Sequence, residues 1–429
     1  MAETDGLPRS RPLSWVSRDA WTIIAARGLR TFAQASVGVL IGIYLTLLGF
    51  DYIQVGLFIS IGLAGGAVFS TLIAFVGDAF GRRRLLALFT LFTGAAGLAL
   101  AFSDQFIVLA AVMFLGSFNA AGGAPTGPVQ PLEQAALPET VAAERRTRLF
   151  GLYSIVSTGT RALGSLAAGL PLVFEHLFGM EQLTAYRVMF GGFAVIGAVA
   201  ALLYARLSPA IELASVRRHW TNPFKLPSRR RIFTMSALFS TDTFATRLVP
   251  QSLVALWFYE RFGIDVAAIG FLYFLTEVLH TVSMWVAVKA AERFGLLNTI
   301  IYSHIPAVLF VAIFPFMPSA PLAMAAWLGR GFFSQMDGPT RHSYTMGVVG
   351  ADERSAMAGF NNMGQNIAST ASPTVTTLFW SIGWTGVPFL VSAGLKSVYL
   401  AGFYATFHGI KPPEEHGASP QPESRATLA

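Results

Sequence analysis

The sequence predicts an all-α integral membrane protein with twelve transmembrane helices arranged as two pseudo-symmetric six-helix bundles. Three observations predict this fold class: the composition, the length of the apolar segments and an internal repeat. Of the 429 residues, 54% are hydrophobic and 12% are charged, whereas soluble proteins carry about 25% charged residues. This composition is typical of a chain embedded in lipid.

Apolar segments long enough to cross a membrane recur along the whole chain. A hydrocarbon core of about 30 Å requires about 20 helical residues. The segments are continuously apolar and lack the alternation of barrel strands, so they are expected to be helices. The predicted spans are 20–48, 53–76, 85–103, 106–130, 149–171, 186–206, 232–258, 266–290, 296–317, 321–345, 356–382 and 386–408.

The positive charges are distributed unevenly between the two sides of this topology. Most of the 30 lysines and arginines lie in the two tails and in alternate loops, including the run Arg82, Arg83 and Arg84. Arg187 and Arg261 are assigned to the opposite side. Since basic loops remain cytoplasmic, we expect a multi-pass protein of the cell inner membrane with both termini in the cytoplasm. The net charge of +7 then reflects topology, and nucleic acid is not an expected partner.

Polar segments divide the chain into five parts. Residues 1–19 form an N-terminal cytoplasmic tail without the apolar core of a signal peptide. The segment 207–231 is the longest polar interruption and is expected to be a cytoplasmic linker between a first half, 20–206, and a second half, 232–408. The tail 409–429 is rich in Pro, Glu and Ser and is expected to be disordered.

The two halves contain an internal repeat. The segment GFDYIQVG from Gly49 to Gly56 aligns with GIDVAAIG from Gly263 to Gly270, and Asp78 and Gly81 then align without a gap with Glu292 and Gly295. Repetition of an acid and a glycine in register indicates duplication. Related halves of a polytopic protein usually move about a site at their interface, which predicts a transport function.

The loop AFVGDAFGRRRLL, between the second and third spans, resembles the signature loop of the major facilitator superfamily. The segments AERFG, AAERRTRLFG and GADERSAMAGF resemble other cytoplasmic loops of that family. The resemblance implies that Asp78, Gly81, Arg82 and Arg83 latch the two halves on the cytoplasmic side, with Glu292 at the equivalent acidic position. Alternatively, the arginines only anchor the topology.

Span 149–171 contains GTRALGSLAAG, which has the glycine spacing of the antiporter motif in this family. It lacks the proline that follows the position of Gly164 in that motif. The resemblance therefore favours export of the substrate. The arginine often found in the fourth span of the family is absent, so its role in proton coupling is not transferred to this chain.

Charged and polar residues inside the spans are the candidate substrate-cavity residues. An ionised side chain at mid-bilayer costs roughly 2.5–3.5 kcal/mol, so such residues are expected to face the bundle interior. The resemblance implies that spans 1, 4, 7 and 10 line the cavity, and span 11 adds a polar patch. The candidates are Arg27, Arg30, Asn119, Asp242, Arg247, Arg330, Asp337, Asn361 and Gln365.

Two ion pairs are predicted between the halves. Arg30 and Asp242 lie at similar depths and form either a fixed strut or a bond that is exchanged for substrate. Glu133 and Arg341 occupy equivalent repeat positions with opposite charges, so they are candidates for an inner gate that closes when the cavity faces outward. Alternatively, Glu133 and Arg341 are two independent solvated residues.

Glu277 and His280 are the candidate proton carriers, together with Asp242. Their i, i+3 spacing places Glu277 and His280 on one helix face, where they can titrate as a coupled pair. Alternatively, they form a structural hydrogen-bond pair between spans.

These features predict a secondary active transporter that moves a small organic solute across the cytoplasmic membrane by alternating access, with proton-coupled efflux. The expected partners are the solute, protons and the lipid bilayer, and a monomer is expected. No phosphate loop, paired zinc ligands or nucleophile elbow is apparent, so no enzyme activity, cofactor or metal is predicted. The alternatives are proton-coupled uptake of an organic anion, and a non-transporting sensor or assembly factor that kept the fold.

Overall fold

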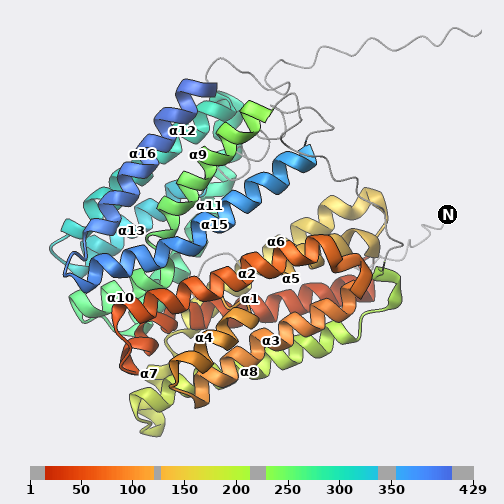
Figure 1. Ribbon diagram of the computed structural model, residues 1–429, viewed down its shortest axis with the longest axis horizontal. Helices are drawn as coiled ribbons and strands as arrows, with labels where there is room; N and C mark the ends of the chain where they lie inside the picture. Colours follow the sequence, from red (N-terminus) through yellow and green to blue (C-terminus); the bar gives the residue numbers. More distant parts are fainter. Residues whose placement is uncertain (1–14, 120–126, 213–228, 337–353, 408–429) are drawn as a thin grey trace, which may run out of the picture. The chain divides into compact units, whose positions relative to one another are not determined.

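The computed structural model describes residues 15–119, 127–212, 229–336 and 354–407, and all regular elements within them are helices (Figure 1). Arg341, Asp337 and the side chain of Asp78 lie outside the part that the structure describes. The helices of the first half are α1 (Arg18–Leu47), α2 (Tyr52–Phe80), α3 (Arg82–Phe102), α4 (Phe106–Leu115), α5 (Val129–Ala136), α6 (Arg146–Ala167), α7 (Leu170–Phe178) and α8 (Gln182–Ala205).

The second half has the same all-helical character over its described residues. Its helices are α9 (Arg229–Arg247), α10 (Gln251–Phe262), α11 (Val266–Phe294), α12 (Leu296–Ile313), α13 (Ala320–Ser334), α15 (Arg354–Ser381) and α16 (Val387–Phe407). Over the described residues, each predicted span therefore overlaps one helix or two consecutive helices. Among the described residues, seven helices are long and apolar enough to cross a membrane uninterrupted.

One of the interrupted spans breaks at a proline, a residue that cannot continue a helix. Between α9 and α10 the chain reaches Pro250, which has no backbone N–H to donate. The carbonyl of Leu248 at this break accepts a hydrogen bond from the Thr376 hydroxyl. Such a replacement partner is required because lipid offers none to a freed backbone group. Discontinuous helices of this kind often border the binding sites of transporters.

The internal repeat is also visible in the backbone. Gly49 and its repeat mate Gly263 have φ of +87° and +63°, and Gly81 and its mate Gly295 have φ of +81° and +82°. Residues other than glycine rarely adopt a positive φ. Each pair ends one helix and lets the next begin after a tight turn, so the repeat extends from sequence to local geometry.

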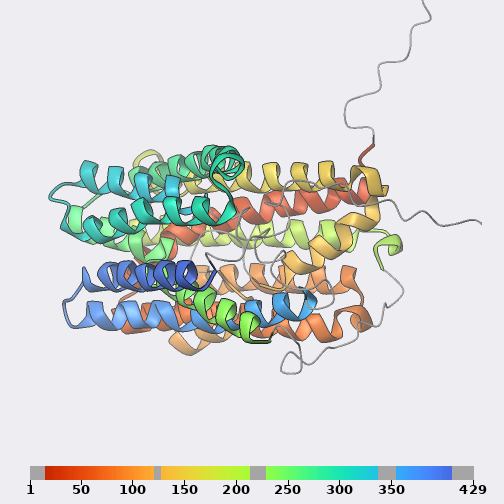
Figure 2. The same ribbon diagram turned by 90° about the horizontal axis from the view of Figure 1, so that it is seen from above.

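The contacts divide the chain into two compact units. Unit 1 contains Met1–Arg218, Arg247–Glu277 and Ser369–Thr385, and unit 2 contains His219–Thr246, Val278–Ala368 and Gly386–Ala429. Within unit 1, α3 packs against α8 and α1 packs against α6 and α8 (Figures 1 and 2). Within unit 2, α12 packs against α13 and α16.

Glycines allow the closest of these helix approaches. A Cβ atom added to Gly164 of α6 would lie 2.2 Å from the backbone oxygen of Phe32 on α1. A Cβ atom added to Gly159 of the same helix would meet nothing within 4 Å. The α1–α6 interface therefore requires glycine at position 164 but not at position 159.

The substitution Gly164→Ala is expected to destabilise the protein by about 1–3 kcal/mol, since α1 and α6 must move apart to admit the methyl group. Gly159→Ala is the matched control on the same helix and is expected to leave stability unchanged. Thermal unfolding of both purified variants in detergent, followed by tryptophan fluorescence, compares them. Equal unfolding temperatures for the two variants would show that α1 and α6 do not pack closely at Gly164.

Candidate functional site

A buried charge cluster lies inside the first half, around Glu133 of α5. The Glu133 side chain is completely buried. Its carboxylate accepts hydrogen bonds from Arg27 Nη1 at 3.2 Å and from Arg30 Nη1 at 2.8 Å. It also accepts bonds from the hydroxyl of Tyr153, at 2.7 Å, and from the hydroxyl of Tyr204. These five residues, called the charge cluster below, come from α1, α5, α6 and α8.

The position of the two arginines on α1 explains how they reach one carboxylate. Arg27 and Arg30 are three residues apart and therefore share one face of the helix. Arg27 is fixed further, because its Nε donates to Ser157 Oγ at 3.1 Å and its guanidinium lies 5.1 Å from the centre of the Tyr153 ring. Arg27 is 4% exposed, whereas the Arg30 side chain is 12% exposed. Arg30 is therefore the more accessible cation of the cluster.

The charge cluster carries one positive charge in excess when its carboxylate is ionised, because two guanidinium groups share that carboxylate. Arginine stays protonated in proteins. In an apolar bundle an uncompensated charge has a large solvation cost, so the cluster favours the approach of a further anion. Its excess positive charge distinguishes the charge cluster from a neutral structural ion pair.

Arg30 and Asp242 each have an ionic partner within their own unit, and a pairing of the two with one another stays a prediction. Arg30 binds Glu133, as described above, and Asp242 Oδ1 accepts a hydrogen bond from Lys396 Nζ at 2.8 Å. Both members of the second pair are buried in unit 2. The sequence showed the charges but not the distances between helices, so the partner Lys396 was missed.

The pairing of Glu133 with Arg341 is not tested, since Arg341 lies outside the described residues. The structure places Glu133 in the interior of the first half, bound to α1, α6 and α8. An alternative was that Glu133 is independently solvated, and its complete burial excludes this. A role for Glu133 in gating stays a prediction.

Glu277 of α11 forms an ion pair that the sequence analysis did not predict. Its Oε2 lies 2.7 Å from Arg161 Nη2 on α6, and both side chains are largely buried. Both residues belong to unit 1, and the pair joins α6 of the first half to α11 of the second half. His280 follows one turn later on α11, as its spacing predicted.

The remaining cavity candidates are distributed over both units. Asn119 is buried in unit 1, and the Arg330 guanidinium lies 4.4 Å from the centre of the Trp327 ring in unit 2. Gln365 accepts a hydrogen bond from Thr243 Oγ1 at 3.0 Å in unit 2. Arg247 ends α9, and Asn361 lies one turn before Gln365 on α15.

The arginine-rich loop binds the ends of neighbouring helices. The backbone N–H groups of Arg82 and Arg83 donate to the Glu212 carboxylate at 2.7 and 3.1 Å, where the N-terminal dipole of α3 favours an anion. The guanidinium of Arg82 donates to the carbonyl of Ala135, and that of Arg83 donates to the carbonyl of Leu207.

These bonds of the loop all lie within unit 1. Glu212 is a further residue that the sequence analysis missed, since it lies in the predicted linker. Glu292, the acidic residue at the position equivalent to Asp78, is exposed near the end of α11. A latch between the two halves, formed by Asp78, Gly81, Arg82 and Arg83 together with Glu292, stays a prediction.

Helices of the two halves form an inter-half contact inside unit 1, at the end of the helices away from the arginine-rich loop. Here α1 meets α10, α2 meets α15 and α6 meets α11. A Cβ atom on Gly42 would lie 2.8 Å from the Ser252 oxygen, and one on Gly270 would lie 2.6 Å from the Ser165 oxygen. These small residues bring the backbones of the two halves into direct contact.

The α2–α15 part of the inter-half contact is equally close and carries hydroxyl groups. A Cβ atom on Gly56 would lie 1.9 Å from Thr377 Oγ1. One turn further along α2, the hydroxyls of Ser60 and Thr374 share a hydrogen bond of 2.7 Å. The inter-half contact therefore combines small residues with neutral hydrogen bonds.

A carboxyl group lies at the edge of the inter-half contact. The Tyr52 hydroxyl donates to Glu260 Oε2 at 3.0 Å. Glu260 follows the predicted end of span 232–258, and burial raises the pKa of its carboxyl, although the bond from Tyr52 partly opposes this rise.

The helices and buried charges define a polytopic membrane protein, and comparison with known proteins identifies its family. The family model described as Major Facilitator Superfamily matches residues 23–333 and 243–429. The chain therefore belongs to the major facilitator superfamily and is a transporter of that family. This confirms the predicted fold class.

Individual relatives are distant in sequence. The uncharacterized membrane protein YJR124C of Saccharomyces cerevisiae is 21% identical over 411 residues, which cover 88% of this chain and 92% of the relative. The structure of the nucleoside transporter NupG matches with a TM-score of 0.70 at 15% identity, over 91% of this chain and 99% of NupG. The D-xylose-proton symporter matches with a TM-score of 0.66 at 12% identity, over 90% and 96% of the two chains. At these identities the structural matches establish the fold alone.

The charge cluster is expected to respond strongly to removal of its carboxylate. Glu133→Gln leaves two buried guanidinium groups without their counter-ion, which is expected to lower the free energy of unfolding by about 3–5 kcal/mol. In the double variant with Arg27→Gln, the loss is expected to be smaller than the sum of the two single losses. The free energy of unfolding in mixed micelles is measured for wild type, the two single variants and the double variant, which form a double-mutant cycle.

Glu144→Gln is the control for this cycle, because it neutralises an exposed glutamate and is expected to have little effect. Strict additivity of Arg27→Gln and Glu133→Gln would mean that the two side chains do not interact.

Proposed function

We propose that this transporter moves a small organic solute across the cytoplasmic membrane by alternating access, with proton-coupled efflux. In this proposal it acts as a monomer in the cell inner membrane, with both termini in the cytoplasm. The inter-half contact is the observation that carries the proposal. Under the predicted topology it lies on the extracellular side, because it is at the end of the helices away from the arginine-rich loop.

The composition of the inter-half contact suits a surface that separates and closes again. Gly42, Gly56 and Gly270 allow close packing without long side chains that would interlock. The hydrogen bond between Ser60 and Thr374 is neutral and can be replaced by water when the contact opens. An alternating-access transporter needs such a surface on each side of its binding site.

Protonation of Glu277 is the proposed link between the proton gradient and this movement. Its carboxylate binds Arg161 across the two halves at 2.7 Å. A proton on Glu277 removes its negative charge and weakens this bond, which favours separation of α6 from α11. His280, on the same face of α11, and Asp242, bound to Lys396, are the further candidate proton sites.

Export is the proposed direction, since it agrees with the glycine spacing of span 149–171. The second candidate is proton-coupled uptake of an organic anion. It is favoured by the excess positive charge of the charge cluster, which an anionic group of the solute would neutralise. In both candidates a proton gradient is the driving force.

Transport by the purified full-length protein in proteoliposomes tests the proposal. A thermal-shift screen against metabolites and toxic compounds first selects solutes, and their movement is then followed under an imposed pH gradient. At least one solute is expected to move against its own gradient only while the proton gradient exists. Reversal of the gradient distinguishes efflux from uptake by the sign of the coupled flux.

Glu277→Gln is expected to lose the dependence of transport on the proton gradient, because its side chain cannot titrate. Glu181→Gln is the matched control, since Glu181 is exposed before α8. Proton-driven transport by Glu277→Gln at the wild-type rate would exclude this residue as the proton site. If no solute moves and a partner protein binds tightly instead, the protein is a sensor or assembly factor.

A further inference from the structure

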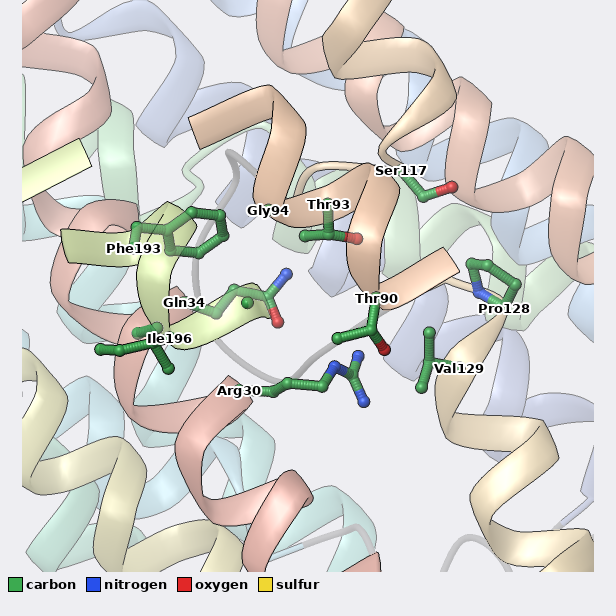
Figure 3. A pocket seen from close by; sticks show the side chains of 12 residues that line it. Arg30, Gln34, Thr90, Thr93, Gly94, Ser117, Pro128, Val129, Phe193 and Ile196 are labelled. Atoms are coloured by element: carbon green, nitrogen blue, oxygen red, sulfur yellow. The ribbon is translucent and has the colours of Figure 1, made fainter. Parts of the chain in front are cut away.

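The first half contains a pocket next to the charge cluster, and no role has yet been assigned to it. Twelve residues of α1, α3, α5, α8 and the segment between α4 and α5 line the pocket, which has about 430 Å³ of empty space. Figure 3 shows the side chains of Arg30, Gln34 and Thr90 converging from α1 and α3, while Phe193 and Ile196 of α8 lie at one side. All of the lining residues belong to unit 1.

The size of the enclosed part limits the ligand. Much of the empty space is open, and the enclosed part has room for about one or two water molecules. This volume suits a carboxylate group but not a whole organic solute. The apolar side chains of Phe193 and Ile196 are suited to the carbon atoms next to such a group.

Two buried hydroxyl groups in this pocket have no partner among the described residues. The side chains of Thr90 and Ser117 are 1% and 6% exposed, and neither hydroxyl oxygen forms a hydrogen bond. A buried hydroxyl without a partner is costly and therefore uncommon. Ser117 also has a φ of +48°, which is unusual for a residue other than glycine. Such strain is typical of positions where a ligand is bound.

Thr93 provides the contrast within the same pocket. It lies one turn after Thr90 on α3 and also lines the pocket. Its hydroxyl is engaged by the carbonyls of Phe89 and Gly116, at 2.8 and 2.7 Å. The two threonines therefore share position and side-chain type but differ in whether the hydroxyl is already occupied.

We propose that this pocket binds the carboxylate group of an anionic solute, held by Arg30 and by the hydroxyl group of Thr90. The carboxylate supplies the acceptor that the Thr90 hydroxyl lacks. It also neutralises the excess positive charge that Arg27, Arg30 and Glu133 together leave in the bundle. The proposal rests on the proposed function, because it identifies the chemical class of the transported solute.

Arg30 connects this site to the charge cluster. Its Nη1 atom binds Glu133 Oε1 at 2.8 Å, while its side chain also lines the pocket. A carboxylate in the pocket competes with Glu133 for this guanidinium. Binding of the solute therefore weakens one of the two ionic bonds between α1 and α5, while Arg27 keeps the other.

Binding of simple carboxylates to the full-length protein in lipid nanodiscs tests the proposal without any transport step. Sodium propionate is titrated against the protein at constant ionic strength, with sodium chloride as the balancing salt, and the unfolding temperature is recorded. A saturable rise in that temperature is expected, because a ligand that binds the native state stabilises it. Chloride alone is expected to give no saturable rise.

The paired threonines supply the decisive variants. Thr90→Val is expected to weaken propionate binding by about tenfold or more, since it removes a hydrogen bond to a charged group. Thr93→Val is the matched control and is expected to keep the wild-type affinity. If Thr90→Val does not fold, Thr90→Ala takes its place, with the same expected loss of affinity.

Equal affinity of wild type and Thr90→Val, or equal stabilisation by chloride and propionate, would overturn the carboxylate site. The proposed function would survive that result if proteoliposomes still transport a solute. If propionate binds as expected but no solute moves, the site stands and the transport proposal fails.

Discussion

A lipid bilayer offers no partner to a charged side chain, and this constraint organises the interior of the protein. Each ionised group at mid-bilayer costs roughly 2.5–3.5 kcal/mol. Arg27 and Arg30 offset this cost by sharing Glu133 within the first half. Asp242 offsets it by binding Lys396 within the second half. Each of these ionic contacts joins helices of a single half, so it stabilises that half without linking it to the other.

The inter-half contact, in contrast, is formed mainly by uncharged residues. Gly42, Gly56 and Gly270 bring backbones together, and the hydroxyls of Ser60 and Thr374 add a neutral hydrogen bond. Separation of α1 from α10 and of α2 from α15 at these residues leaves no unpaired charge behind. The ion pair of Arg161 with Glu277 is different, because it crosses between α6 and α11. A titratable group at a surface that must separate is suited to couple protonation to movement, which is why we assign Glu277 that role.

The sequence predicted the helices and the functional residue types better than their partners. Continuous apolar runs determine where a chain can cross lipid, and the repeated glycines at 49 and 263 marked equivalent turns that the backbone confirms. Arg30, Asp242 and Glu277 were identified because charges in apolar spans are rare. Their partners depend on which helices become neighbours. The spacing of residues along the sequence does not give the distances between helices. The unpartnered hydroxyl of Thr90 could not be predicted either, because a threonine on an apolar helix has no distinctive sequence pattern.

The claim that the inter-half contact opens during transport can be tested by locking it. The chain contains no cysteine, so the double variant Ser60→Cys, Thr374→Cys introduces the only thiols, at two side chains whose oxygens are 2.7 Å apart. Oxidation is expected to join α2 to α15 and abolish solute transport in proteoliposomes, and reduction is expected to restore it. Transport at the full rate with the disulfide intact would contradict alternating access through this contact.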